Sequence, residues 1–327
     1  MSTVETRDVR KWFPLESLRI LAREREGKYV KAVDGVTISI KQGEIHGLVG
    51  ESGSGKTTTG KMICKLLDPS AGTILIDGRD LSELPRDRIK EMRREIQYVF
   101  QDPYSSIDDR LNVRRIMRDP LQILGIDSTE EALARSLERC GLSPGKEFLE
   151  KHPRQMSGGQ RQRLCLARIL LLQPKLIVAD EVVSMLDVST RVGVLDLINE
   201  LRREEGLTCI FITHDIISAQ YLCDKISVMY LGKIVESGPS NEVVSRPRHP
   251  YTRVLMASVP RLEAKGAPPN IMGEPPDAAN IPSGCAFNPR CPHATDICHT
   301  QIPELIEIDP GHLAACHHIR DIEGQRH

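Results

Sequence analysis

One eight-residue stretch has the residue types and spacing needed to bind phosphate groups. Gly50-Glu51-Ser52-Gly53-Ser54-Gly55-Lys56-Thr57 fits the pattern G-x-x-x-x-G-K-S/T at every defined position. The glycines allow backbone N–H groups to turn toward phosphate oxygens, and a helix that starts here adds the positive end of its dipole. Lys56 can reach the β- and γ-phosphates of a nucleotide, and the Thr57 hydroxyl can ligate Mg2+. The stretch is therefore a candidate nucleotide site.

The flanking sequence predicts the elements that would hold this loop. The apolar run at 44–49 predicts a buried strand before the loop, and 58–67 predicts a helix after it. Residues 32–40 alternate between apolar and polar side chains, which predicts a half-buried strand. Residues 73–76, enclosed by Gly72 and Gly78, predict a further short strand. The loop thus lies in a strand-loop-helix context within β-rich sequence.

A second candidate site is a pair of acids that follows a buried strand. The continuous apolar run at 176–179 predicts a strand buried on both faces, and Asp180 and Glu181 come directly after it. A carboxylate at the carboxyl end of a parallel strand is well placed to hold magnesium through its water shell. The next carboxylate can orient or deprotonate an attacking water.

Two other predicted strands also end in polar side chains. The strand at 96–100 ends at Gln101, and Pro103 then stops ladder pairing, so Gln101 lies at a strand-to-loop boundary where a side chain can sense a ligand. The strand at 208–213 ends at His214, which can form a hydrogen bond with a terminal phosphate.

The sequence between these strands predicts helices. Ser128-x-x-Glu131 fits a capping box within the helical text of 111–155. Ser157-Gly158-Gly159-Gln160 precedes a helical pattern at 161–172. Two glycines at a helix start expose backbone N–H groups, so this helix start is a second candidate anion site.

Length and charge limit the possible functions. The chain has 327 residues, which suits one large domain and a smaller one. Lys and Arg number 44 against 45 Asp and Glu, so no global field attracts nucleic acid. The start of the chain lacks the apolar core of a signal peptide, and no apolar run approaches the roughly 20 residues of a membrane span. We expect a soluble protein in the cytoplasm.

The cysteines fall into two groups. Five lie singly in apolar periodic stretches and are expected to be small buried hydrophobes: Cys64, Cys140, Cys165, Cys209 and Cys223. Four follow one another near the C-terminus with five, six and seventeen intervening residues: Cys285, Cys291, Cys298 and Cys316. In a cytosolic protein such a group more often binds a metal than forms disulfides, and the alternative is four unliganded thiols. The spacing leaves the metal open, and nearby histidines keep zinc possible: His293, His299, His317 and His318.

Taken in order, these motifs resemble the nucleotide-binding subunit of an ABC transporter over about residues 4–240. The resemblance covers six motifs in the family's order: Walker A (50–57), Q-loop (Gln101), signature (157–160), Walker B (177–181), D-loop (184–187) and switch histidine (His214). It implies an α/β fold: a P-loop NTPase (RecA-like) core with an antiparallel β subdomain and an α-helical insert, plus a small irregular C-terminal extension. The implied domains are 1–240, with the helical subdomain at about 102–165, and 241–327.

The resemblance also implies roles for individual residues, with ATP and Mg2+ as cofactors. The nucleotide phosphates would be bound by Gly50, Ser52, Gly53, Ser54, Gly55, Lys56, Thr57 and Thr58. Magnesium would be held by Thr57, Gln101 and Asp180. Catalysis would use Glu181 as the base, together with His214, Lys56 and Gln101. A second subunit's ATP would be contacted by Ser157, Gly159 and Gln160, and Asp187 would link the two sites. The adenine would stack on Phe13, with Trp12 and Tyr29 as alternatives.

The C-terminal 90 residues resemble the tail of oligopeptide and dipeptide importer ATPases, through the runs at 248–252 and 283–292. Relatives with these four cysteines look like they hold a 4Fe-4S cluster. The resemblance therefore implies such a cluster here, and we prefer it to zinc. The resemblance implies an ATPase subunit of a binding-protein-dependent importer, with peptides as the leading cargo and oligosaccharides or nickel as alternatives. A soluble ABC ATPase outside transport is the alternative from a different class.

The same resemblance implies partners and location. We expect a paralogous ATPase chain in a heterodimer, two transmembrane permease subunits and an extracytoplasmic substrate-binding protein, and we expect no nucleic acid. The chain would be peripheral, at the cytoplasmic face of the cell membrane.

Overall fold

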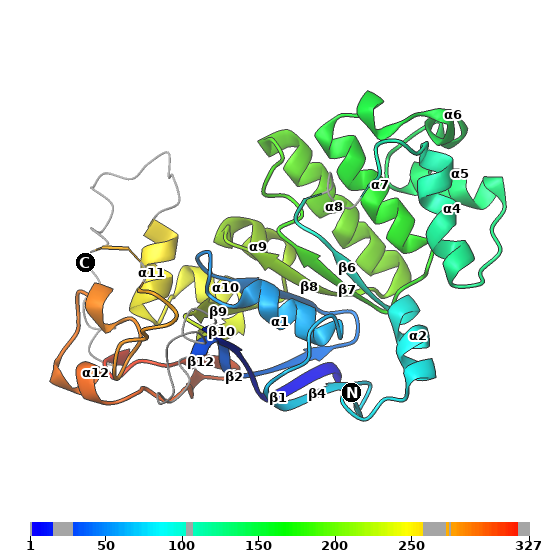
Figure 1. The fold of residues 1–327 in the computed structure, drawn as a ribbon. Coiled ribbons are helices and arrows are strands. Elements are labelled where there is room, and N and C mark those ends of the chain that lie inside the picture. Colours follow the sequence, from blue (N-terminus) through cyan, green and yellow to red (C-terminus); the bar gives the residue numbers. More distant parts are fainter. Residues whose placement is uncertain (1, 16–28, 103–106, 258–272, 275, 320–327) are drawn as a thin grey trace. The chain divides into compact units, whose positions relative to one another are not determined.

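The computed structural model describes residues 2–15, 29–102, 107–257, 273–274 and 276–319 (Figure 1). The chain divides into two compact units. The first comprises Met1–Lys41, Ile45–Ser82 and Ile212–His327, and the second comprises Gln42–Glu44 and Glu83–Phe211. Each unit combines helices with sheet strands. The predicted α/β class is therefore confirmed.

An antiparallel sheet in the first unit has the strand order β2-β1-β4-β5. Its strands are β1 (Ser2–Pro14), β2 (Tyr29–Lys41), β4 (Ala71–Ile76) and β5 (Arg79–Asp80). In β2, Val36, Ile38 and Ile40 are buried and the residues between them are exposed, because side chains alternate between the two faces of a strand. The strands predicted at 32–40 and 73–76 are confirmed.

The core sheet of the first unit carries the strand that leads into the phosphate loop. Its order is β11-β12-β10-β9-β3. The bounds are β3 (Ile45–Val49), β9 (Lys225–Tyr230), β10 (Lys233–Pro239), β11 (Ile306–Asp309) and β12 (His312–Ala314). All of β3 is buried, and it runs parallel to β9. The predicted buried strand before the loop is confirmed.

The helices of the first unit begin with the one after the phosphate loop. They are α1 (Lys56–Ile63), α9 (Ile216–Leu222), α10 (Ser240–Ser245), α11 (Pro250–Ala257), η3 (Asn288–Arg290) and α12 (Asp296–Thr300). Helix α1 begins two residues before the predicted start at residue 58 and ends before the predicted end at residue 67. Lys65 has a left-handed φ of 54°, a conformation that ends a helix.

Part of the C-terminal tail belongs to the core sheet. Strand β12 pairs antiparallel with β10, with Glu236 opposite Ala314 and Ser237 opposite Leu313. Strand β11 then pairs with β12. Within the predicted extension, residues 258–272, 275 and 320–327 lie outside the described residues. The described tail is therefore held by main-chain hydrogen bonds to β10.

The second unit contains a sheet of order β8-β7-β6. The strands are β6 (Ile96–Val99), β7 (Leu176–Asp180) and β8 (Thr208–Thr213), and the last residues of β8 lie in the first unit. Strands β6 and β7 run parallel, with Tyr98 opposite Val178. Every residue of β7 is buried, as the continuous apolar run predicts.

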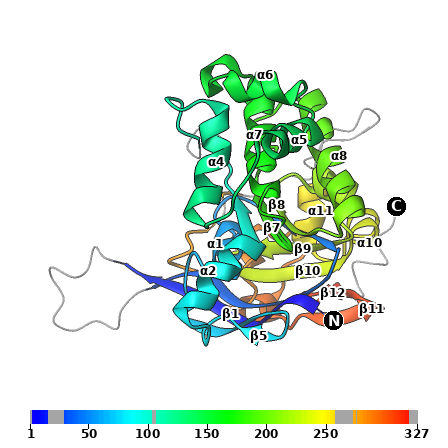
Figure 2. The same cartoon turned by 90° about the vertical axis from the view of Figure 1, so that its right-hand side faces the viewer.

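The second unit also contains helices, several of them within residues 102–165, where a helical subdomain is expected. They are α2 (Arg86–Glu95), α4 (Val113–Ile123), α5 (Glu130–Arg139), α6 (Gly145–Glu150), η2 (Pro153–Gln155), α7 (Gly158–Leu170) and α8 (Val188–Glu205). Helices α4 and α5 pack beside α7 (Figure 2). The capping box predicted at Ser128 is wrong by one residue, because the N-cap is Thr129, whose hydroxyl accepts from the Ala132 N–H at 3.3 Å.

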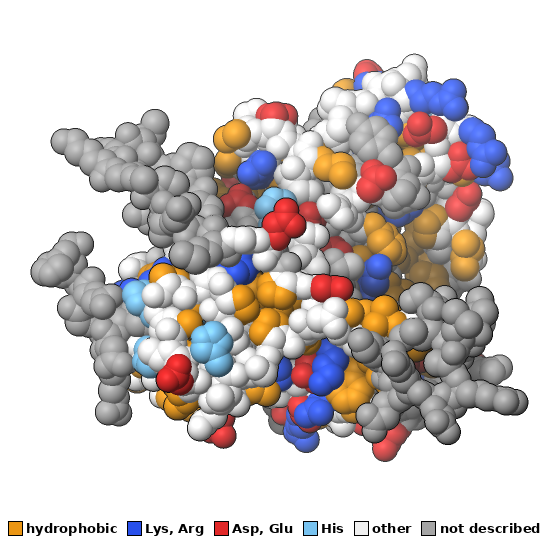
Figure 3. Space-filling view, turned by 60° about the vertical axis from the view of Figure 1, so that its left-hand side comes forward, with side chains coloured by type: hydrophobic (Ala, Val, Ile, Leu, Met, Phe, Trp, Pro, Cys, Tyr) orange, Lys and Arg blue, Asp and Glu red, His pale blue; other side chains and the backbone are white. Residues whose placement is uncertain are grey.

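The face of the molecule drawn in Figure 3 is mixed in character. On the face drawn in Figure 3, basic and acidic side chains are interspersed with hydrophobic ones. Within the described ranges, none of the helices is both long enough and apolar enough to cross a membrane.

A buried carboxylate ties the tail to the core of the first unit. Glu236 on β10 is fully buried. Its Oε1 accepts from the Arg248 backbone N–H and lies within hydrogen-bond distance of His312 Nε2, both at 2.8 Å. Its Oε2 accepts from the His249 N–H at 2.9 Å. One side chain thus joins β10, the segment before α11, and β12.

We predict that Glu236→Ala lowers the free energy of unfolding by about 3 kcal/mol, because it leaves two buried backbone N–H groups without an acceptor. Chemical denaturation followed by circular dichroism measures the loss. Glu242→Ala, on the exposed face of α10, is the matched control and should change stability by less than about 0.5 kcal/mol. Equal stability of the two variants would contradict the prediction.

Candidate functional site

The predicted phosphate loop lies between β3 and α1, and its backbone has the expected conformation. Gly53 and Gly55 have φ angles of 78° and 104°, which glycine adopts without strain. Gly55 is the N-cap of α1, and its carbonyl accepts from the Thr59 N–H at 2.9 Å. The loop therefore ends at a helix N-terminus, where free backbone N–H groups and the helix dipole favour an anion.

Lys56 is held inside this loop. Its side chain is buried, and Nζ donates to the carbonyl oxygens of Gly50 and Glu51, each at 2.8 Å. A third, longer bond runs to Ser54 Oγ at 3.4 Å. By contrast, Thr57 at the second helical position is exposed. The loop thus combines a fixed cation with an exposed hydroxyl.

The remaining predicted residue of the first unit follows β8. His214 is exposed. The next residue, Asp215, is the N-cap of α9, and its carboxylate accepts from the Ile217 N–H at 3.0 Å and from Ser218 Oγ at 2.6 Å. The helix cap therefore fixes the backbone directly after His214.

In the second unit the predicted acids and Gln101 come together. Asp180, the last residue of β7, is buried, and Glu181 follows it with a left-handed φ of 48°. Gln101 Nε2 donates to Glu181 Oε2 at 2.8 Å. The Glu181 carbonyl accepts from Ser184 Oγ at 2.8 Å. A left-handed non-glycine residue between such contacts is typical of functional sites.

The sequence analysis did not single out Tyr98. Its hydroxyl donates to Asp180 Oδ2 at 2.5 Å, a short bond to a charged acceptor. The two side chains meet because Tyr98 lies on β6, which runs parallel to β7. A tyrosine near the end of a predicted strand is a weak signal by itself, so only the strand pairing identifies this contact.

The second candidate anion site is an exposed helix start that is capped by its own residues. Ser157 Oγ accepts from the Gln160 N–H at 3.3 Å, and Gln160 Oε1 accepts from the Ser157 N–H at 3.0 Å. A Cβ at Gly159 would lie 2.3 Å from Thr190 Cγ2, so α7 and α8 approach closely at this glycine. The motif therefore has a structural role in addition to any ligand contact.

Asp187 has a similar local role as the N-cap of α8. Its Oδ1 accepts from Ser189 Oγ at 2.7 Å and from the Thr190 N–H at 3.0 Å, and its Oδ2 accepts from Thr190 Oγ1 at 2.7 Å. These hydrogen bonds, first that from Ser189, hold the pKa of the Asp187 carboxyl well below its usual range. Asp187 is therefore ionised and exposed at neutral pH.

The three aromatic candidates lie at one end of the β1–β2 pair. Phe13 is opposite Val30, and Tyr29 is opposite Pro14. The ring centroids of Trp12 and Tyr29 are 6.5 Å apart. Phe13 and Tyr29 are exposed, and Trp12 is half-buried. These positions do not single out one of the three rings.

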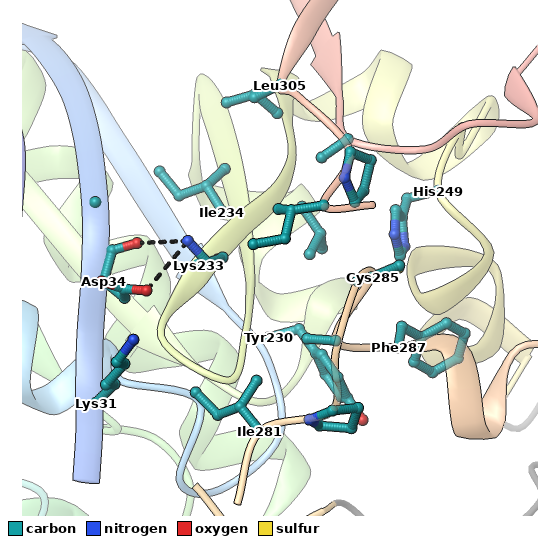
Figure 4. Close-up of a pocket in the computed structure, with 18 of the residues that line it drawn as sticks. Lys31, Asp34, Tyr230, Lys233, Ile234, His249, Ile281, Cys285, Phe287 and Leu305 are labelled. Carbon is teal, nitrogen blue, oxygen red and sulfur yellow. Dashed lines mark hydrogen bonds and ion pairs between the residues drawn. The ribbon is translucent and has the colours of Figure 1, made fainter. Parts of the chain in front are cut away.

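The four C-terminal cysteines lie close to one another in the first unit. Burial raises the pKa of the Cys291 thiol and of the Cys316 thiol to about 11 each, and repulsion from the neighbouring cysteines adds to the rise. The Cys285 backbone N–H donates to the Cys298 carbonyl at 2.8 Å. Cys285 also borders a pocket of about 620 Å³ lined largely by apolar side chains (Figure 4).

The cysteines do not form the shell of a single ion. Among the described residues, no group of three or more His, Cys, Asp or Glu side chains is arranged to hold one metal ion. A tetrahedral zinc would need sulfur atoms about 3.8 Å apart, given Zn–S bonds of about 2.3 Å. Two of the nearby histidines have other partners: His318 Nε2 lies 2.8 Å from Thr295 Oγ1, and His317 Nε2 lies 3.0 Å from the Gln301 carbonyl.

Comparison with known families matches two regions. The family described as ABC transporter matches residues 33–184. The family described as oligopeptide/dipeptide transporter, C-terminal region, matches residues 235–298. The first region contains the predicted nucleotide-site residues other than Asp187, His214 and the aromatic candidates, and the second contains Cys285, Cys291 and Cys298.

Individual proteins agree with these matches. The chain is 43% identical over 322 residues to the oligopeptide transport ATP-binding protein AppF of Bacillus subtilis, covering 96% of each chain. The ATP-binding cassette MJ0796, solved as a dimer in a post-hydrolysis state bound to ADP and Pi, is 30% identical with a TM-score of 0.62, covering 72% of this chain and 98% of that one. CbiO1 of Clostridium perfringens, part of the ABC transporter complex cbiONQ, is 26% identical with a TM-score of 0.64, covering 75% and 91%.

The phosphate loop, the acids after β7 and the capped helix start of α7 thus occur in a chain whose relatives are ATP-binding proteins along almost its whole length. The chain belongs to the ABC transporter family of ATP-binding proteins and carries the C-terminal region of oligopeptide/dipeptide transporters.

Proposed function

We propose that this chain hydrolyses ATP to drive the import of di- or oligopeptides. The observation that carries the proposal is the phosphate loop, which fixes Lys56 at the start of α1. Support for peptides as cargo comes from the 43% identity to an oligopeptide transport ATP-binding protein and from the matched C-terminal region. Oligosaccharides or nickel are the alternative cargo. A soluble ABC ATPase outside transport is the alternative from a different functional class.

The residues of the site have distinct roles in this proposal. The phosphates of ATP are bound by Lys56 and by the other residues of the loop and the start of α1, mainly through their backbone N–H groups. These other residues are Gly50, Ser52, Gly53, Ser54, Gly55, Thr57 and Thr58. Thr57, Gln101 and Asp180 would hold Mg2+, which would supply positive charge against the phosphates. Glu181 takes the proton of the attacking water, since Gln101 holds its carboxylate from one side. His214 would orient the γ-phosphate, and Phe13 would stack on adenine, with Trp12 and Tyr29 as alternatives.

A second ATPase chain completes the proposal. The exposed start of α7 would contact the nucleotide of the partner chain through Ser157, Gly159 and Gln160, and Asp187 would link the two sites. We favour a paralogous chain, hence a heterodimer. The other partners are two transmembrane permease subunits and an extracytoplasmic substrate-binding protein, which place the chain peripherally at the cytoplasmic face of the membrane.

We predict that Glu181→Gln lowers the rate of ATP hydrolysis at least 100-fold and leaves ATP binding intact, because the amide cannot accept the proton. Phosphate release and equilibrium ATP binding measure the two effects. The control is Glu200→Gln, which changes an exposed acid on α8 and should leave both unchanged. Hydrolysis at the wild-type rate in Glu181→Gln would rule out Glu181 as the base.

We predict that Tyr98→Phe raises the Mg2+ concentration needed for half-maximal ATP hydrolysis by about tenfold. The hydroxyl donates to Asp180, and loss of such a partner of a metal ligand typically weakens the metal site 10- to 100-fold. A magnesium titration of the ATPase rate measures the shift. Tyr221→Phe, at an exposed position of α9, is the control. An unchanged magnesium requirement would show that the Tyr98 bond only supports the fold.

We also infer that the four cysteines hold a 4Fe-4S cluster, with Zn2+ as the alternative. Support comes from the grouping of four free cysteines in the C-terminal tail, three of which lie in the matched oligopeptide/dipeptide transporter region. A cluster with four thiolate ligands needs sulfur atoms spaced more widely than one zinc does. Cys285, Cys291, Cys298 and Cys316 would be its ligands.

We predict about four irons and four sulfides per chain after anaerobic purification, and their loss in Cys291→Ser. Chemical analysis of iron, sulfide and zinc measures the content. Cys209→Ser, a buried cysteine on β8, is the control and should keep the metal. About one zinc per chain would show that the cysteines bind zinc and not the cluster. Metal-free wild-type protein would exclude both.

A further inference from the structure

Glu51, the second residue of the phosphate loop, is bound at its N–H, its carbonyl and its carboxylate by three different residues. Its backbone N–H donates to Tyr251 Oη at 2.8 Å. Its carbonyl accepts from Lys56 Nζ at 2.8 Å. Its carboxylate accepts two parallel bonds from Arg290, at 2.8 and 3.0 Å. Tyr251 and Arg290 both belong to the C-terminal tail, and Arg290 is 239 positions from Glu51 along the chain.

Arg290 is built into this position rather than resting on a surface. Its side chain is 4% exposed, against 26% for that of Glu51. The guanidinium carbon lies 5.9 Å from the ring centroids of both Tyr230 and Phe287. A bidentate pair with so little solvent around the guanidinium is weakly screened and has a fixed geometry. The bonds to Glu51 are the main cause of a raised Arg290 pKa.

The aromatic rings around Arg290 form a rigid support. The ring centroids of Tyr230 and Tyr251 are 4.6 Å apart, and the rings of Tyr230 and Phe287 meet at 90° with centroids 5.3 Å apart. Tyr230, Tyr251 and Phe287 are all fully buried. Tyr230 and Phe287 also border the pocket of Figure 4. Since Tyr230 ends β9, the support continues directly into the core sheet.

These contacts connect the tail to the ammonium group that binds phosphate. Lys56 Nζ donates to the Glu51 carbonyl, so a shift of Glu51 changes the position of an acceptor of Lys56. Arg290 fixes Glu51 through its carboxylate, and Tyr251 fixes it through its N–H. Arg290 also directly precedes Cys291 in the chain. Glu51 is therefore the residue through which the cysteine-containing part of the tail contacts the phosphate loop.

We propose that Arg290 is a positioning residue for the phosphate loop, through which the C-terminal tail sets the affinity for nucleotide. The inference rests on the proposed nucleotide site. Arg290 acts only through Glu51 and does not touch the nucleotide itself. A purely structural ion pair would change the stability of the chain and leave nucleotide affinity unchanged.

The test is the dissociation constant of MgADP, measured by calorimetry on the full chain, for wild type, Arg290→Gln, Glu51→Gln and the double variant. ADP keeps hydrolysis out of the measurement. We expect each single variant to raise the dissociation constant about tenfold, within the range typical of couplings between sites. Each leaves one buried or half-buried charge without its partner. The double variant pairs two neutral amides and should bind ADP more tightly than either single variant.

The matched control is Arg248→Gln. Arg248 is another buried arginine of the tail, 8% exposed at its side chain, and its guanidinium pairs with Asp309 of β11 at 2.5 Å. We expect this variant to lower the thermal unfolding midpoint and to bind MgADP like wild type. The unfolding midpoints of all variants are measured in parallel, so a loss of stability is separated from a loss of affinity.

Arg290→Lys keeps the test decisive if Arg290→Gln does not fold. Lysine retains the charge but cannot form the two parallel bonds, so we expect a smaller loss of MgADP affinity than with glutamine. Wild-type affinity in folded Arg290→Gln or Arg290→Lys would overturn the inference, as would losses that simply add in the double variant. A wild-type chain that does not bind MgADP would instead overturn the proposed function.

Discussion

The phosphate loop packs backbone against backbone at both of its ends, and the rest of the first unit depends on this close approach. A Cβ at Gly50 would lie 2.3 Å from the Met229 carbonyl oxygen, and a Cβ at Gly55 would lie 2.3 Å from the Ala32 carbonyl oxygen. No side chain tolerates such contacts, so glycine is required at both positions before any ligand is considered. Strands β9 and β2 thereby determine where the loop runs and where α1 begins.

The sequence predicts the parts of the fold and site that local chemistry controls. The strand before the phosphate loop is predicted because buried parallel strands are continuous apolar runs. Gln101 and Glu181 are each predicted as site residues at strand ends, and the observed pairing of β6 with β7 brings them into contact. The capped start of α7 is also predictable, since Ser157 and Gln160 form a local capping box. In each case the contact involves residues close in sequence or elements that pair in a sheet.

Contacts that depend on tertiary packing were not predictable in the same way. No periodicity relates Arg290 to Glu51, and no motif relates Tyr98 to Asp180. The N-cap of α5 shows the limit at shorter range. Ser128 and Thr129 both have a hydroxyl that can cap a helix, and the pattern with Glu131 favoured the wrong one. Local propensity fixes the presence of the helix more firmly than its first residue.

The C-terminal tail is integrated with the core of the first unit by three independent kinds of bond. Strand β12 adds main-chain hydrogen bonds to β10, the Glu236 carboxylate binds buried N–H groups of the segment before α11, and Arg290 binds the phosphate loop. A tail needed only for docking to other proteins could be attached by a flexible linker and an exposed surface. Burial of charged groups such as Glu236 and Arg290 is tolerated only when their partners are fixed in place. The tail therefore has to fold together with the strands and the loop that carry the nucleotide site, and a change in the cysteine region has a direct structural route to Glu51.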